Sequence, residues 1–543
     1  MDWLAGEGTA DSPYRIDTAD QLILLSKASI LWNRHFVLGA DIDLDPVLPG
    51  RRIFGQAVIP VFTGVFDGGG HVISNLVIEG SQNLGLFGHL TGEAEVKNVG
   101  VVDANIIGSG GNVGVLAGHN EGSIATSSSS GSVSGTGGSV GGLVGLNDNA
   151  GIAASYSGGS VRGAKSVGGL VGYNGGHSSI VASYSSGSVS RTESVGGLVG
   201  YNEDGSINSS FWDIQTSGWT TSAGGTGKTS AEMQSIETFL LAGWDFVDEV
   251  ANGTCDYWRI SPGDYPQLRY HSGNRPLMPE GLGTAEQPYL IRDARDLGTV
   301  WFEPLAHYRL AQSVDLSGIR WSMAVIPGFG GSFDGSGYVI GNLHIQGGSY
   351  LGLFGHLGST ASVSSLGLEA VEVNGTDSVG GLVGSNWGSI DSSSSSGSVS
   401  GTSFAGGLVG FSRGSIATSH STGSVNGTDY YIGGLVGFNW ATIATSYSSG
   451  PVTSTTSVAG GLVGRNKGSI NSSFWDIQTS GWTTSADGTG KTTAEMQMAK
   501  TFLAAGWDFV GESKNGTEDI WWILEGKDYP RLWWELSQDN MVP

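Results

Sequence analysis

A few residues of this 543-residue chain have the types and spacing that metal binding would need. Asp41, Asp43 and Asp45 alternate along the chain, so all three side chains would face the same side of a β-strand. Clustered carboxylate oxygens are the ligands that calcium prefers. These three aspartates are therefore candidate calcium ligands, and the sequence predicts no other cofactor.

The residue patterns that would indicate polysaccharide cleavage are weaker than the pattern for metal binding. Glycoside hydrolysis needs a pair of carboxyl groups, but Glu121, Asp148 and Glu193 fall at different positions of a repeated unit. A lyase would instead need a base and a charge neutraliser. Side chains of those types are present at His420, Tyr447, Arg413 and Arg465. A polysaccharide hydrolase or lyase therefore stays an alternative, while the sequence leans away from an enzyme.

A glycine-rich GTGKT segment occurs twice and imitates a phosphate-binding loop. Such a loop needs a glycine separated by four residues from the Gly-Lys pair, so that backbone amides can surround a phosphate. Ser222 and Ser485 occupy that position. We expect a loop that leads into a closing helix, not a nucleotide site.

Aromatic residues are the strongest candidates for ligand contact, because sugar rings stack on aromatic faces. Trp219 and Trp482 lie in polar SGWTTSA segments, which favours exposure. A second set recurs once per repeat, and it could either bind a ligand or fill a corner of the core. The recurring set includes Tyr156, Tyr184 and Tyr447, whereas Trp387 and Trp440 follow recurring asparagines in the second half only. The full set of candidates is Trp219, Trp482, Tyr156, Tyr184, Tyr447, Trp387 and Trp440.

The segments that would position these residues occur twice in the sequence, as an internal duplication. GTADSPYRI from Gly8 recurs as GTAEQPYLI from Gly283, and SSFWDIQTSGWTTSA from Ser209 recurs from Ser472. The chain is therefore predicted to contain two domains, residues 1–275 and 276–543.

Within each half runs a shorter period built on Gly-Gly-Leu-Val-Gly. Its first glycines include Gly114, Gly141 and Gly168, which lie 27 residues apart. Each unit contains three short apolar stretches bounded by Gly, Ser or Asn, as expected for three brief strands and turns. Such units stack into a β-solenoid, or β-helix, because one coil cannot bury its own apolar face. The predicted fold is all-β, with two tandem solenoids of ~27-residue, three-stranded coils.

Two features of the repeat predict what lies inside the stack. The apolar residues of successive coils should point inward, and an asparagine recurs once per coil at Asn120, Asn147, Asn174 and Asn202. Stacked asparagine amides hydrogen-bond along a solenoid. Segments with helix-like spacing open each half from Ile16 and Leu290, and others close it from Thr229 and Thr492. We expect these segments to cover the strand edges at both ends.

The repeats resemble the Glug-motif family, named for its Gly-Leu-Val-Gly core. Four copies match in each half, from Gly114 to Trp212 and from Gly380 to Trp475. The resemblance implies a β-solenoid at the bacterial surface, as in adhesins and in the non-catalytic part of immunoglobulin A1-degrading metallopeptidases. The His-Glu-x-x-His zinc helix of those peptidases is absent from this sequence.

Composition limits the partners. Lys and Arg total 25 against 49 Asp and Glu, a net charge of −24, which repels nucleic acid and anionic membranes. No apolar run is long enough to insert into a membrane. Met1 leads directly into a polar segment, so either an initiator Met has replaced a signal peptide or the chain is not exported. The composition favours the first.

Together these patterns favour an acidic extracellular or bacterial cell-surface repeat protein. It would act as an adhesin or as a module that binds a polysaccharide or host glycan. Because a whole capped domain is duplicated, binding could be bivalent. A structural or self-assembling spacer is a second alternative.

Overall fold

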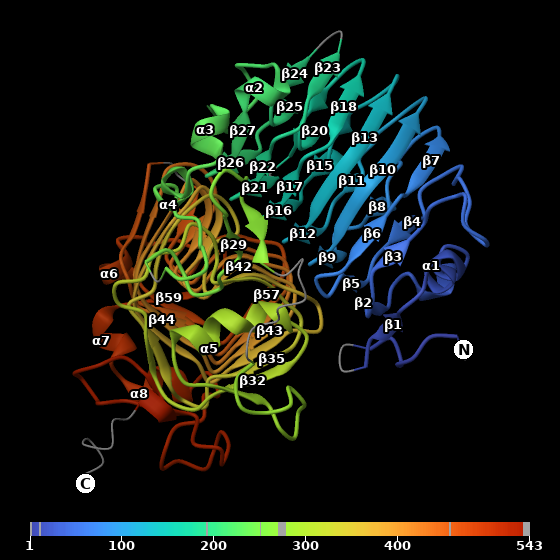
Figure 1. The fold of residues 1–543 in the computed structure, drawn as a ribbon. Coiled ribbons are helices and arrows are strands. Elements are labelled where there is room, and N and C mark those ends of the chain that lie inside the picture. The colour runs from blue at the N-terminus through green and yellow to red at the C-terminus, as the bar shows by residue number, and fades with distance from the viewer. Residues whose placement is uncertain are drawn as a thin grey trace. The chain divides into compact units, whose positions relative to one another are not determined.

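The computed structural model describes residues 3–9, 12–176, 178–191, 194–249, 251–269, 278–455 and 458–535. The chain divides into two compact units, Met1–Leu277 (unit 1) and Met278–Pro543 (unit 2). The predicted junction between residues 275 and 276 lies outside the described residues. Each unit is a solenoid of stacked parallel strands, with about 16 turns in the chain (Figure 1). The predicted all-β solenoid fold is therefore confirmed.

Unit 1 consists of four parallel sheets that run along the stack and a terminal hairpin. The first sheet contains β1 (Tyr14–Ile16), β2 (His35–Leu38), β5 (Val65–Asp67), β9 (Glu95–Lys97), β12 (Ser123–Ala125), β16 (Gly151–Ala153), β21 (Ser179–Val181) and β26 (Ser206–Asn208). The second contains β3 (Ile42–Asp43), β6 (Val72–Ser74), β7 (Val77–Gly80), β10 (Gly100–Gly108), β13 (Ser128–Gly135), β17 (Tyr156–Ser157), β18 (Ser160–Gly163), β22 (Tyr184–Ser185), β23 (Val189–Arg191), β27 (Phe211–Asp213) and β28 (Thr226–Lys228). The third contains β4 (Ile59–Phe62), β8 (Phe87–Leu90), β11 (Ala117–Asn120), β15 (Val144–Asp148), β20 (Val171–Gly175) and β25 (Val199–Asn202). A short fourth sheet contains β14 (Val140–Gly141), β19 (Val167–Gly168) and β24 (Val195–Gly196), and the hairpin is β29 (Trp258–Arg259) with β30 (Gln267–Leu268).

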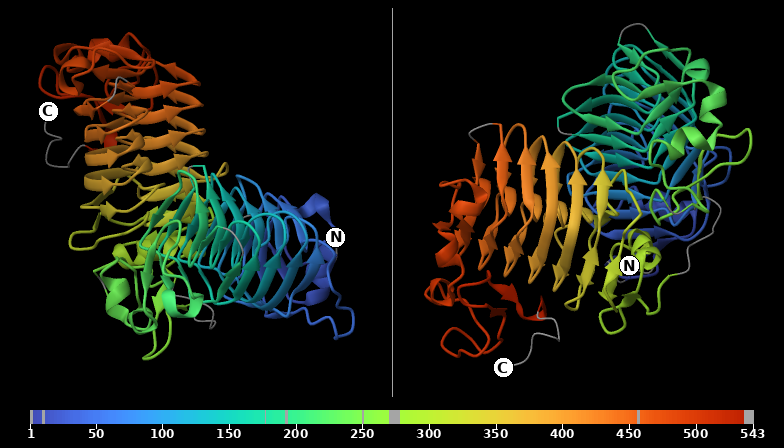
Figure 2. Two further views of the ribbon diagram at one scale, coloured as in Figure 1. Left: turned by 90° about the horizontal axis from the view of Figure 1, so that it is seen from above. Right: turned by 90° about the vertical axis from the view of Figure 1, so that its left-hand side faces the viewer.

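Unit 2 repeats this plan (Figure 2). Its first sheet contains β31 (Tyr289–Ile291), β32 (His307–Leu310), β35 (Ser332–Asp334), β39 (Ser362–Ser364), β43 (Ser389–Asp391), β47 (Ser415–Ala417), β52 (Thr442–Ala444) and β57 (Ser469–Asn471). The second contains β33 (Val314–Asp315), β36 (Val339–Gly341), β37 (His344–Gln346), β40 (Gly367–Asn374), β44 (Ser394–Gly401), β48 (His420–Ser421), β49 (Ser424–Gly427), β53 (Tyr447–Ser448), β54 (Val452–Ser454), β58 (Phe474–Asp476) and β59 (Thr489–Lys491). The third contains β34 (Ile326–Phe329), β38 (Phe354–Leu357), β42 (Val383–Asn386), β46 (Val409–Ser412), β51 (Val436–Asn439) and β56 (Val463–Asn466). The fourth contains β41 (Asp377–Gly380), β45 (Ser403–Gly406), β50 (Ile432–Gly433) and β55 (Ala459–Gly460), and the hairpin is β60 (Trp521–Trp522) with β61 (Arg531–Leu532).

The core is a continuous column of apolar side chains inside each stack. Leu143, Val144 and Ile152 are at most 1% exposed, and the same positions one coil later are equally buried. Parallel pairing holds this register, with Val144 opposite Val171 and Ile152 opposite Ile180. The predicted inward positions are therefore confirmed, and the short fourth sheet is an addition to the three predicted strands.

The asparagine ladder is also confirmed. Asn120, Asn147 and Asn174 each donate from Nδ2 to the Oδ1 of the next asparagine, over 2.7 to 2.8 Å. In unit 2, Asn439 donates to Asn466 over 2.8 Å, whereas Asn386 donates to the hydroxyl of Ser412 over 3.1 Å. These bonds satisfy buried amides and fix the height of each coil.

A second ladder turns the chain at the corner between the first and second sheets. The Ser155 hydroxyl accepts the backbone N–H of Ser127 over 3.1 Å and donates to the carbonyl of Ala153 over 2.8 Å. The residue before each such serine has a left-handed φ of 44° to 49°, although none is glycine. These residues are Thr126, Ala154, Ala182, Ser209, Ser392, Thr418, Thr445 and Ser472.

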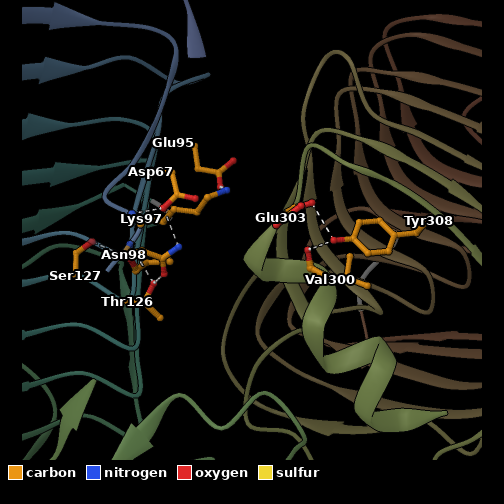
Figure 3. Close-up of polar contacts among 11 residues, drawn as sticks. Asp67, Glu95, Lys97, Asn98, Thr126, Ser127, Val300, Glu303 and Tyr308 are labelled. Atoms are coloured by element: carbon orange, nitrogen blue, oxygen red, sulfur yellow. Dashed lines mark hydrogen bonds and ion pairs between the residues drawn. The ribbon is translucent and has the colours of Figure 1, made fainter. Parts of the chain in front are cut away.

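Polar contacts continue this corner toward the start of unit 1 (Figure 3). The Thr126 hydroxyl donates to Asn98 Oδ1 over 2.7 Å, and Asn98 Nδ2 donates to Asp67 Oδ1 over 3.0 Å. Lys97 is buried and pairs with Glu95 over 2.7 Å. Asp67 also accepts the Gly69 N–H, so it caps a turn as Asp commonly does.

Short helices cover the ends of each stack, as the sequence predicts. Near the start lie α1 (Ala19–Leu25) in unit 1 and α5 (Ala294–Thr299) in unit 2. The closing segments form α2 (Ile214–Ser217), α3 (Ser230–Met233), α4 (Ile236–Leu240), α6 (Ile477–Ser480), α7 (Thr493–Met496) and α8 (Ala499–Leu503). The N-cap of α3 is Thr229, whose hydroxyl accepts the Glu232 N–H in a capping box.

The GTGK segments are strands rather than the predicted loops. Strand β28 pairs with β27, the last strand of its sheet in unit 1. Just before it, Ser222 accepts the N–H groups of Leu198 and Val199 over 3.3 and 2.9 Å. The segment therefore satisfies backbone groups that the last coil would otherwise expose. Among the described residues no helix has the length and apolar character to cross a membrane.

Candidate functional site

The best candidate surface lies at one corner of unit 2, where the third sheet ends. There each ladder residue is followed by an outward-facing side chain. The backbone N–H groups of Arg413, Trp440 and Lys467 donate to the ladder carbonyls of the preceding coil over 2.7 to 2.8 Å. Trp387, Arg413, Trp440 and Lys467 thus stand one coil apart in a single file, which we call the Trp387–Lys467 column.

Aromatic and cationic side chains alternate along this column. The Arg413 guanidinium carbon lies 4.6 Å from the ring centroid of Trp387 and 5.4 Å from that of Trp440. The Lys467 Nζ lies 4.1 Å from the Trp440 ring. These are cation–π distances, and each contact holds both side chains in a defined orientation. Trp440 remains 41% exposed, and Arg413 and Lys467 are exposed.

A second row of aromatic residues flanks the column. Phe411 and Phe438, which precede ladder residues, face outward on neighbouring strands, and their ring centroids lie 5.6 Å apart. Arg465 continues the row, with its guanidinium carbon 5.0 Å from the Tyr431 ring and 5.6 Å from that of Phe438. It also donates to the Tyr431 hydroxyl. Tyr430 is 52% exposed beside this row. The corner therefore combines flat apolar faces with three cations.

Unit 1 carries a different surface at the same corner. The residues that follow its ladder positions are Glu121, Asp148, Gly175 and Glu203. Because Asn120 pairs with Asn147 in the register, Glu121 and Asp148 share one repeat position, and the expectation that they fall at different positions is wrong. Tyr173 donates to Glu203, which together with burial raises the pKa of Tyr173 to about 12. His119 faces outward one position before its ladder asparagine, and burial followed by the charge of His89 lowers its pKa. The corner is acidic in unit 1 and cationic in unit 2, so the two units do not present duplicate sites there.

Of the seven aromatic candidates, the structure brings Trp387 and Trp440 into one surface. Lys467 and the role of Arg413 between the two tryptophans were not predicted from the sequence. Reading the residue after each ladder position would have revealed the alternation. Ser412, which replaces asparagine in one coil, hides that pattern.

Trp219 and Trp482 are not the exposed contact residues that their polar neighbours suggest. Both are half-buried, and their indole N–H groups donate to the carbonyls of Val189 and Val452 over 2.9 Å. The Trp219 carbonyl accepts the indole N–H of Trp212 over 2.9 Å. These tryptophans close the last coil of each solenoid because its core would otherwise face water.

The recurring tyrosines are core residues. Tyr184 and Tyr447 are 2% and 1% exposed, and their hydroxyls donate to the carbonyls of Pro266 and Pro530 over 2.6 Å. Tyr156 stacks on Tyr184, with centroids 5.0 Å apart and planes 6° apart. Burial raises the pKa of all three hydroxyls. The closing segments cover Tyr184 and Tyr447, so the assignment of these two to ligand binding is wrong, whereas Tyr156 is half-buried.

The same packing buries His420 and Tyr447, two of the residues considered for a lyase. His420 is 4% exposed and stacks on Tyr447 with centroids 4.9 Å apart, and burial lowers its pKa. Its Nε2 lies 3.4 Å from Glu535 of the closing segment. Neither His420 nor Tyr447 can meet a polymer in this arrangement.

The three aspartates considered for calcium face outward, as predicted, but each serves a separate contact. Asp41 accepts the Val72 N–H over 3.0 Å, Asp43 accepts from the Asn75 side chain over 2.9 Å, and Asp45 accepts the Val47 N–H over 3.0 Å. The bond from Asn75 is the main cause that lowers the pKa of Asp43. Among the described residues these carboxylates do not form a shared metal-binding cluster. Calcium binding by these three aspartates therefore stays a prediction.

Comparison with known proteins finds similarity over parts of the chain. No known protein-family profile matches it, so the resemblance to the Glug-motif family stays a prediction. The chain is 34% identical over 140 residues to halomucin of Haloquadratum walsbyi, covering 24% of this chain and 2% of that protein. It is 34% identical over 140 residues to a provisionally named Gly-rich membrane protein of Evansella cellulosilytica, covering 22% and 16%. It thus spans a small part of the curated relatives it matches.

One solved structure is also similar. It is a provisionally named immunoglobulin A1 protease of Bacteroides ovatus, 22% identical, with a TM-score of 0.38. The similarity covers 49% of this chain and 94% of the other. The β-solenoid fold and the two curated relatives, halomucin and the Gly-rich membrane protein, fit an extracellular repeat protein.

Proposed function

We propose that this chain is an extracellular glycan-binding repeat protein and that the Trp387–Lys467 column of unit 2 binds an acidic polysaccharide. The carrying observation is the alternation of two tryptophans with two cations along one file of coils. The tryptophan surface left exposed beside the cations can pack against the apolar faces of sugar rings. Arg and Lys pair with carboxylate or sulfate groups, with Arg able to bind them in a bidentate way.

The dimensions of the column suit a polymer. Coils of a β-solenoid are about 4.8 Å apart, so three steps from Trp387 to Lys467 span about 14 Å. That length accommodates more than one sugar ring, and the flanking half-buried Phe411 and exposed Arg465 widen the surface. The column and its flank therefore offer repeated contacts to a chain of sugars.

The net negative charge of the protein does not oppose this ligand. At physiological ionic strength the Debye length is about 8 Å, so distant carboxylates are screened. Arg413, Lys467 and Arg465 lie within the surface itself and act directly on a bound acid group. Localisation outside the cell is part of the proposal, and the halomucin relative supports it.

The test is binding of the whole protein to intact neutral and acidic polysaccharides, measured by affinity electrophoresis and calorimetry. Trp440→Ala should weaken binding about tenfold, because a lost stacking contact is worth roughly 1.4 kcal/mol. Arg413→Gln should weaken binding to acidic polymers and leave neutral ones unaffected. The matched control is Asp148→Asn, which changes the corresponding position in unit 1.

Binding that survives both substitutions in unit 2 would refute the assignment to this column. Equal binding to neutral and acidic polymers would refute the role of the cations. A polymer whose length falls during incubation would show cleavage and favour the enzyme alternative.

A further inference from the structure

A cluster of two histidines and one glutamate lies on the outer face of unit 1. His89 on β8 and His119 on β11 are partners in the parallel register of adjacent coils. Their rings stack with centroids 4.4 Å apart and planes 6° apart. Glu121 follows the ladder asparagine two residues after His119 and turns its carboxylate toward both rings.

The nitrogens that face Glu121 lack ordinary hydrogen bonds. Both Nε2 atoms are buried, and neither makes a hydrogen bond of acceptable geometry with any described residue. Their distances to the Glu121 oxygens are 3.2 Å for His89 and 3.5 Å for His119. A buried polar atom without a partner is costly, so a native structure that keeps two of them side by side calls for a ligand.

We propose that His89, His119 and Glu121 form a zinc-binding site. Two imidazole nitrogens and one carboxylate oxygen are a donor set of the kind that binds Zn²⁺ through three protein ligands. With metal–ligand bonds of about 2.0–2.1 Å, the ligands of a tetrahedral ion lie about 3.3 Å apart. The two Nε2–oxygen distances fall on either side of that value, and all three ligand atoms lie within 4.8 Å of one another.

Metal binding requires one rearrangement. In a parallel stack the nitrogen lone pairs of the two rings do not converge, so each ring must rotate about its Cβ–Cγ bond. This torsion has a broad energy profile for histidine, and the rotation is therefore inexpensive. The side chains are 28%, 17% and 38% exposed for His89, His119 and Glu121, so an ion can enter and keep a fourth position open to water or a ligand.

Unit 2 supplies a natural comparison for this site. Its residues in the same places are His356, Ser385 and Trp387, with His356 opposite Ser385 in the register. A single histidine beside a serine and a tryptophan cannot replace the donor set of unit 1. One Zn²⁺ per chain is therefore expected, although the solenoid is duplicated.

The experiment is titration of the untagged full-length protein with Zn²⁺ alone, by calorimetry and by competition with a coloured chelator. The wild type should bind one equivalent. His119→Ser and Glu121→Gln should each weaken binding at least 100-fold, and His356→Ser in unit 2 should leave it unchanged. Because serine occupies the position of His119 in unit 2, His119→Ser is compatible with the fold.

Substitution of Co²⁺ for Zn²⁺ gives a second reading, since a four-coordinate site with nitrogen ligands should produce intense visible absorption that His119→Ser abolishes. Binding that is unchanged in His119→Ser, or that His356→Ser weakens equally, would overturn the assignment. So would the absence of Zn²⁺ binding to a wild-type protein shown to be folded by circular dichroism.

Discussion

Replacing Asn147 tests whether the asparagine ladder holds the solenoid together. Its side chain is fully buried, donates to Asn174 over 2.8 Å and accepts from Asn120 over 2.8 Å. Asn147→Ala leaves one donor and one acceptor buried without partners. Each such group costs about 1–3 kcal/mol, so the free energy of unfolding of unit 1 should fall by about 2–6 kcal/mol.

Unit 2 suggests a second substitution at Asn147 whose effect on stability should be smaller. There Ser412 stands in the ladder, accepts from Asn386 over 3.1 Å and donates to the Gly414 carbonyl over 2.8 Å. Asn147→Ser should likewise keep an acceptor for Asn120 and leave only the Asn174 oxygen unpaired. Its cost should therefore be about half that of the alanine variant.

Calorimetry of the whole protein measures the effect, with a loss of about 5–10 °C expected in the unit 1 transition for Asn147→Ala. Cys255, the single cysteine of the chain, is buried in unit 1, so thiol labelling during heating identifies which transition belongs to that unit. Equal losses for alanine and serine, or losses below about 0.5 kcal/mol for both, would show that the ladder amides do not act as paired groups.

Three further outcomes follow from buried groups at the closed ends. His420→Tyr should reduce the acid sensitivity of unit 2: burial lowers the pKa of His420, so its stabilising effect is present above about pH 6.5 and is lost as the pH falls below it. Denaturation at pH 5.5 and 7.5 checks this, and an unchanged difference between the two pH values would exclude His420 as the cause. Trp219→Ala should cost about 2 kcal/mol of unit 1 stability while polysaccharide binding stays intact, since the ring closes the last coil; weakened binding in a stable variant would contradict that role. Burial raises the pKa of the Cys255 thiol, so native protein at pH 8 should resist labelling for hours, and rapid labelling before unfolding would show that the cap opens locally.

Much of the fold could be predicted from the sequence, because the same residue pattern recurs in each coil and so indicates the same structure several times. The inward positions of Leu143 and Ile152, the ladder through Asn147 and the capping helices all follow from a 27-residue period combined with burial and hydrogen bonding. The strand at Thr226–Lys228 was missed because its glycines are typical of a loop. It pairs with β27 only because the last coil needs a partner, which is a tertiary requirement.

The candidate sites were less accessible. The polar residues around Trp219 suggested that its side chain is exposed. Local composition does not show that this segment lies at the end of the solenoid, where the Trp219 ring covers the last coil. His89 and His119 were not candidates from the sequence, because they lie in coils that differ from the regular period and only the parallel register pairs them. Trp387 and Trp440 were identified from their place beside ladder residues, whereas their cationic neighbours needed the side-chain geometry.

The ladders also fix the spacing between the side chains that successive coils present to a ligand. Because buried amides and corner serines determine the rise from coil to coil, an outward residue can change from Glu121 to Trp387 between units without moving its neighbours. A polymer bound along such a row of side chains must have a repeat length that matches the spacing between coils. Otherwise its groups lose register with the protein side chains as more coils are contacted. Selectivity for the spacing of acid groups along a sugar chain should therefore sharpen with the number of coils contacted, while the chemistry at each step remains free to vary.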